Sequence, residues 1–62
     1  MIHFAKITTN IGHHEFAQFD SPKGDEATEK AEAIAEQIAR QRGEDITHIE
    51  VYEATLVESF DL

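Results

Sequence analysis

The stretch DEATEKAEAIAEQIARQRG, residues 25–43, decides the fold of this 62-residue chain. Its apolar residues recur at spacings of three and four, which predicts an amphipathic α-helix. Asp25 is predicted as the N-cap, and Gly43 as the left-handed residue that ends the helix. The apolar stripe is narrow and mostly alanine, so we expect the helix to lie close to whatever it covers: Ala27, Ala31, Ile34, Ala35, Ile38 and Ala39.

Strand signals flank the helix on both sides. Residues 2–9 and 14–19 are rich in β-branched and aromatic residues, which predicts two strands. Between them, residues 10–12 include two residue types that tolerate positive φ, which predicts a hairpin turn. Residues 20–24 form a loop by composition, and residues 46–57 are predicted as a last strand with a short tail. We therefore expect one α+β domain over residues 1–62, of ββαβ order. Its three-stranded antiparallel-type sheet has the order 2-1-3, with one helix packed on one face.

The apolar residues of the first and last strands change phase, so they cannot all lie on one face of a flat sheet. We expect one set to face the helix and the other to lie on the open face. The two sets are Ile2, Phe4, Ile49 and Val51, and Ala5, Ile7, Tyr52 and Leu56. An open apolar face indicates a dimer or partner interface. Alternatively, bulges bring both sets into one core.

Charge excludes several classes of partner. Thirteen acidic against five basic residues give a net charge of −8, which disfavours direct binding to DNA, RNA or an anionic membrane. Residues 1–19 contain only Lys6 and Glu15, so the whole excess lies in residues 20–62. The chain has no cysteine, no long apolar run and no basic leader, and we expect it to be cytoplasmic.

A carboxylate field of this kind steers association with a basic protein surface, including one that holds nucleic acid. Three glutamates follow spacings of three and four on the solvent side of the helix, and others continue along the last strand. The alternative is a solvated helix face that only keeps the protein soluble. We expect the partner-binding residues to be Glu29, Glu32, Glu36, Glu50, Tyr52 and Glu53, with Tyr52 as an anchor.

Catalytic and metal-binding patterns are weak. Ser21 and Ser59 lie outside any nucleophile motif, and no glycine-rich loop is present to hold a phosphate, so we expect no enzymatic activity and no cofactor. His3, His14 and His48 could line up across the sheet as an imidazole site. Surface histidines are the commoner explanation, and we expect no metal site.

The stretch from Ala31 to Arg40, continuing through Gly43 into residues 49–54, looks like many short phage and mobile-element proteins. In size, acidity and architecture the chain resembles anti-CRISPR proteins, which are small non-catalytic inhibitors of bacterial immune complexes. This resemblance implies binding to a Cas effector, often at its nucleic-acid-binding surface, in the host cytoplasm. The alternative is a small homodimeric module that associates through the open face of the sheet.

Overall fold

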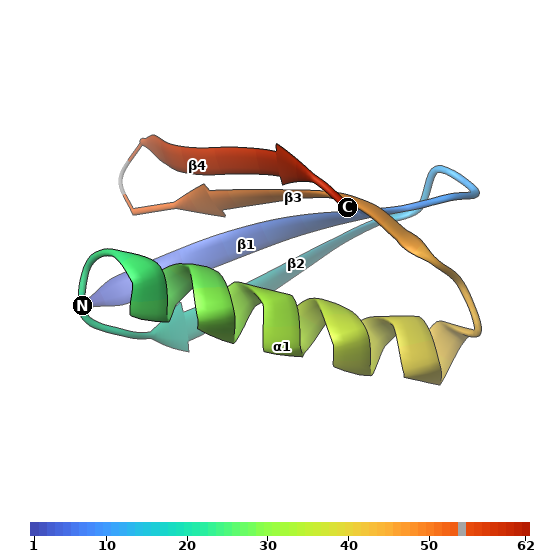
Figure 1. The fold of residues 1–62 in the computed structure, drawn as a ribbon, viewed down its shortest axis with the longest axis horizontal. Helices are drawn as coiled ribbons and strands as arrows, with labels where there is room; N and C mark the ends of the chain where they lie inside the picture. Colours follow the sequence, from blue (N-terminus) through green and yellow to red (C-terminus); the bar gives the residue numbers. More distant parts are fainter. Residues whose placement is uncertain (54) are drawn as a thin grey trace.

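One helix lies along one face of a four-stranded sheet (Figure 1). The computed structural model describes residues 1–53 and 55–62. The strands are β1 (Ile2–Thr9), β2 (His14–Asp20), β3 (Ile46–Tyr52) and β4 (Leu56–Asp61), and the helix α1 spans Asp25–Arg42. Within the described residues, no helix is long and apolar enough to cross a membrane.

The sheet has the order β2-β1-β3-β4, and each neighbouring pair is antiparallel. The predicted α+β class and the predicted neighbours of β1 are confirmed: β2 is on one side of it and β3 on the other. The connection through α1 carries the chain over β1, because β2 and β3 run in the same direction on its two flanks. The first three strands thus follow the predicted 2-1-3 order.

The prediction of three strands is wrong, because the single last strand expected over residues 46–57 is two strands. β3 ends at Tyr52, and the chain reverses into β4, with the Glu53 amide donating to the Thr55 carbonyl at 3.0 Å. Ala54, predicted as part of that strand, lies outside the described residues. No Gly, Pro, Asn or Asp marks this reversal, so the usual hairpin signal is missing from the sequence.

The helix-facing side of the sheet forms the core. Ala5 pairs with Val51 and Ile7 pairs with Ile49, so these four side chains share one face and are at most 1% exposed. They pack against buried alanines of α1. Alanine permits this close approach because its side chain adds little thickness to the interface. Partly buried residues complete the core: Phe19, Ile34, Ile38, Ile46 and Phe60.

The two expected sets of apolar residues are wrong in their composition. Ile2 and Phe4 do not share a face with Ile49 and Val51, but lie on the open face, 45% and 43% exposed. Burial alternates along β1, and the register shift lies between Thr8 and Thr9, after these residues. The cross-strand register determines which apolar residues share a face, because residues directly opposite each other in paired strands lie on the same face of the sheet.

Backbone geometry corrects one end of α1 and confirms the other. Gly24, not Asp25, is the N-cap, with φ at 95° and no side-chain cap. Asp25 is the first helical residue, where its negative charge interacts favourably with the positive end of the helix dipole. Gly43 has the predicted left-handed conformation, with φ at 66° and ψ at 34°, and its amide donates to the Ala39 carbonyl at 2.8 Å.

Candidate functional site

The three helix glutamates of the predicted site form a single line on α1, which we call the acidic row: Glu29, Glu32 and Glu36. Because each helical residue turns by about 100°, these three side chains lie within about 60° of one another around the axis. All three are exposed. No ion pair involves them within residues 1–53 and 55–62.

Two of the three basic residues of the helix are directed elsewhere. Lys30 donates from Nζ to the Asp20 carbonyl at 2.8 Å, on the side of α1 next to β2. Arg42 donates from Nε to Glu15 Oε1 at 2.9 Å, across the C-terminal end of the helix. The acidic row is therefore not neutralised by these helix cations.

The other predicted residues do not join the acidic row. Glu50 and Tyr52 lie on the open face of the sheet, opposite the helix, where the Tyr52 hydroxyl donates to Glu50 at 2.6 Å. Glu53 approaches Lys23 Nζ at 3.8 Å, at the end of β3. The structure thus places three of the six predicted residues on α1, two on the open face of the sheet, and Glu53 just after the end of β3.

A polar network on the open face joins β3 to β4. His48 Nδ1 lies 2.6 Å from Asp61, and its Nε2 lies 2.9 Å from Ser59 Oγ and 3.3 Å from Glu50. The hydrogen bond with Asp61, helped by Glu50, raises the pKa of His48. The Tyr52 hydroxyl bond, helped by His48, lowers the pKa of Glu50, and the same bond raises the pKa of Tyr52.

Ser59, His48 and Asp61 are linked in the order of a nucleophile, base and orienting carboxylate. Two features argue against a nucleophile here. First, Glu50 shares Nε2 and favours the imidazolium, which has no lone pair to accept the serine proton. Second, Ser59 is exposed on the face of the sheet, where water is not excluded. The network is better explained as a link between two strands.

The histidine arrangement considered from the sequence is wrong. His3 is 1% exposed on the helix-facing side, where its ring stacks on Phe19 with centroids 5.4 Å apart. His14 and His48 flank Thr8 on the opposite side of the sheet. The sheet therefore separates His3 from the other two, so the three imidazoles cannot share one ion. Among the described residues, no group of three or more ligand-type side chains could hold a metal ion.

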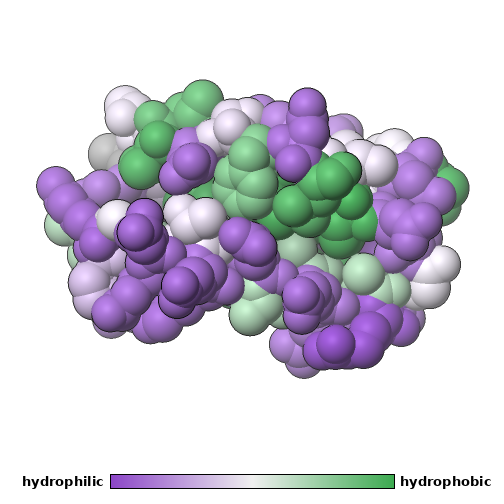
Figure 2. All heavy atoms as spheres, in the orientation of Figure 1, coloured by the Kyte–Doolittle hydropathy of each residue, from purple (hydrophilic) through white to green (hydrophobic). Residues whose placement is uncertain are grey.

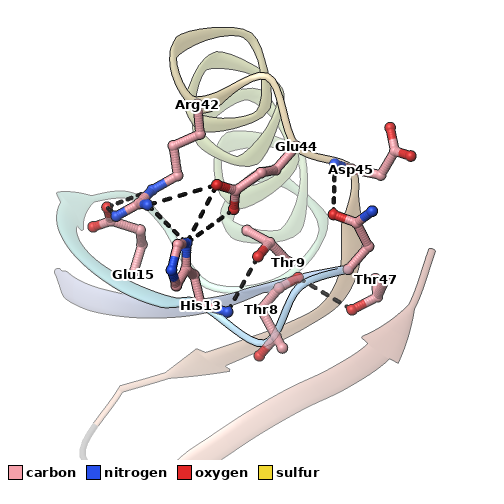
Figure 3. Close-up of polar contacts among 9 residues, drawn as sticks. Thr8, Thr9, His13, Glu15, Arg42, Glu44, Asp45 and Thr47 are labelled. Carbon is pink, nitrogen blue, oxygen red and sulfur yellow. Dashed lines mark hydrogen bonds and ion pairs between the residues drawn. The ribbon is translucent and has the colours of Figure 1, made fainter.

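Sequence reasoning missed a cluster at the C-terminal end of α1, where the helix meets the β1–β2 hairpin (Figure 3). Arg42 bonds Glu15 and lies 3.9 Å from Glu44, and His13 Nδ1 lies 3.0 Å from Arg42 and 3.2 Å from Glu44. The bond to Glu15 raises the pKa of Arg42. The cluster joins residues about thirty positions apart, so periodicity and spacing give no signal for it.

Glu44 is the least exposed carboxylate of this cluster, with 13% of its side chain accessible. Burial acts to raise its pKa, but hydrogen bonds with Thr9 and His13 outweigh it and lower the pKa overall. The guanidinium of Arg42 adds to this effect. All four charged or titratable partners are already engaged with one another. The cluster therefore fastens the helix to the hairpin.

A second feature that sequence reasoning missed is a groove of about 300 Å³ between α1 and the start of β3. From the helix it is lined by Glu32, Ala35, Glu36 and Ala39. From the other side it is lined by Asp45, Ile46 and Leu62. Figure 2 shows hydrophobic atoms bordered by hydrophilic side chains on the face where helix and sheet meet. Two members of the acidic row thus stand at the rim of a largely apolar groove.

Comparisons with protein-family models, curated proteins and solved structures gave no significant match.

Proposed function

We propose that this chain is a non-catalytic acidic binding protein that occupies a basic, nucleic-acid-binding surface of another protein. The observation that carries the proposal is the acidic row, which is exposed and has no ion-pair partner among the described residues. A line of carboxylates on a rigid helix presents negative charge in a fixed direction, as a phosphate backbone does. Such a line would compete with nucleic acid for the same lysines and arginines.

The resemblance to anti-CRISPR proteins suggests one partner, a Cas effector complex in the cytoplasm of the host. An effector of this class holds a guide–target duplex in a positively charged channel. A net charge of −8 on 62 residues supports fast, salt-dependent association with such a channel. Glu50, Tyr52 and Glu53 lie away from the acidic row, so we assign the primary contact to Glu29, Glu32 and Glu36.

The test is inhibition of target-DNA binding by a purified Cas effector loaded with its guide RNA, measured by mobility shift over a salt series. Replacing all three glutamates of the acidic row with lysine should abolish inhibition at moderate salt and flatten the salt dependence. Glu32→Lys should weaken inhibition more than Glu26→Lys, which makes the same charge change about 120° further round the same helix. Unchanged inhibition by the triple variant would contradict the proposed contact.

A second candidate function, homodimerisation through the open face, is favoured by exposed aromatic side chains. Phe16 is 72% exposed and Phe4 is 43% exposed, and Lys6 lies between Phe16 and Glu50 across the strands. Charges of both signs on this face reduce repulsion between two copies. The acidic row of each copy would point outward. Dimerisation would also cover apolar surface that this small core leaves open.

Sedimentation velocity over a dilution series tests this second function. We expect a dimer at low micromolar concentration that Phe16→Thr dissociates. Ile11→Thr is the control, because Ile11 is 61% exposed in the hairpin turn and does not belong to the open face. A monomer at every concentration, or equal effects of the two variants, would rule out the open face as a dimer interface.

A further inference from the structure

The groove between α1 and β3 has a floor and a rim of different character. Ala39, Ile46 and Leu62 contribute apolar surface, and Ala35, which is 1% exposed, also lines the groove. The carboxylates of Glu32 and Glu36 stand one helical turn apart on one side, and Asp45 stands on the other. No ion pair engages these three acids in the part of the chain that the structure describes.

The wall of the groove opposite the helix is held in place by main-chain hydrogen bonds. Asn10 donates its amide to the Asp45 carbonyl at 2.9 Å, and Asp45 donates its own amide to Asn10 Oδ1 at 3.2 Å. The Leu62 amide donates to the Thr47 carbonyl at 3.0 Å. These bonds fix both Asp45 and Leu62 relative to the sheet. The groove therefore exists before a ligand arrives, which lowers the entropic cost of binding.

We propose that this groove receives an arginine side chain of a basic partner protein. The inference rests on the proposed function and specifies its chemistry. An arginine lays its aliphatic stem along apolar surface and keeps its charged head at a polar rim. Here the stem would pack on Ala39, Ile46 and Leu62. The planar guanidinium, with five donors, would bond carboxylates from both sides of the rim.

Other occupants fit this groove less well. A phosphate or nucleic acid is repelled by three carboxylates. A purely apolar side chain would remove water from those carboxylates without giving them a partner. A lysine supplies the charge but concentrates it in one compact, strongly hydrated ammonium. A volume near the lower end of the range for ligand pockets suits one long side chain better than a larger cofactor.

The experiment is an NMR titration of the isotope-labelled full chain with two blocked peptides, hexa-arginine and hexa-lysine, at low salt. We expect hexa-arginine to bind about threefold or more tightly than hexa-lysine. The largest amide shifts should occur at Ala35, Ala39 and Asp45. The spectrum of each variant also reports whether that variant is folded.

Two matched pairs of variants separate the groove from general electrostatic attraction. Glu36→Gln should weaken hexa-arginine binding about threefold more than Glu29→Gln, which removes the same charge from the acidic row outside the groove. Ala39→Leu should weaken binding by filling the groove, whereas Ala33→Leu, on an exposed side of α1, should have no effect.

The outcomes distinguish the two proposals. Binding of both peptides with equal effects within each pair of variants would overturn the groove and leave the proposed acidic binding function standing. No shift with either peptide at low salt would overturn both proposals. Preferential hexa-arginine binding that is lost in Glu36→Gln and Ala39→Leu would support both.

Discussion

His48 has three polar side-chain contacts that its position in the sequence does not indicate. The side-chain oxygens of Asp61, Ser59 and Glu50 all lie within 3.3 Å of its ring nitrogens. Two of these partners are carboxylates, so the imidazolium is the form that the folded state favours. The same contacts fasten β4, an edge strand, to β3. A single titratable residue thus links a local charge state to the pairing of two strands.

The raised pKa of His48 predicts a specific pH dependence of stability. Protonated His48 contributes to the free energy of unfolding, and this contribution is fully present below 6.5, the pKa of the unfolded state. The contribution is lost as pH rises through the higher pKa of the folded state. In urea unfolding from about pH 5.5 to about pH 9, the stability difference between the native chain and His48→Gln should shrink as pH rises.

A matched control for this measurement is His14→Gln on the same face of the sheet, where the imidazole contacts the Thr8 hydroxyl and forms no ion pair within the described residues. The difference in free energy of unfolding between the native chain and His14→Gln should change less over the same pH range. Parallel stability curves for the native chain and His48→Gln would mean that the carboxylates around His48 do not govern its protonation.

At the level of elements, α1 was predictable because its signals are local. Its apolar spacing and its terminal glycine all belong to one continuous stretch, and buried Ala27, Ala31 and Ala35 confirm the predicted stripe. The separation of β3 from β4 was not predictable in this way. Residues 53–55 carry none of the usual turn residues, and the pairing of the two strands depends on contacts such as His48 with Asp61.

The C-terminal end of α1 supplies a prediction at this scale. Gly43 has φ at 66°, and a Cβ there would meet no atom within 4 Å, so a side chain costs backbone strain only. Gly43→Ala should lower the free energy of unfolding by roughly 1–2 kcal/mol. Gly43→Asn should cost less, because asparagine tolerates the left-handed conformation better. Chemical denaturation measures both, and equal losses would contradict this explanation.

At the level of the whole molecule, different surface features lie on the two sides of the sheet. The helix side carries the acidic row and the groove between α1 and β3, and the sheet side carries exposed aromatics with charges of both signs. Because the acidic row is unpaired within the described residues, like charges repel along one line of the helix. Each such pair three or four positions apart is unfavourable by roughly 0.2–0.5 kcal/mol at low salt.

Screening of this repulsion predicts that sodium chloride stabilises the fold. The urea midpoint of the native chain should rise between about 20 mM and about 500 mM salt, because the Debye length falls below the separation of many of these charges. The variant with Glu29, Glu32 and Glu36 all replaced by glutamine should have a higher urea midpoint at low salt. Its midpoint should also rise less when salt is added. An equal salt response in both chains would show that the repulsion lies elsewhere.

The sequence by itself determined the helix, the first hairpin and the excess of negative charge, because each depends on composition or on spacing within one segment. Tertiary structure alone decided which apolar residues share a face, because the register between β1 and β3 joins residues more than forty positions apart. It also separated Glu50 and Tyr52 from the acidic row, since a strand and a helix in different layers turn their polar residues to opposite sides. The groove is likewise a tertiary feature, because its walls come from three segments that only folding brings together.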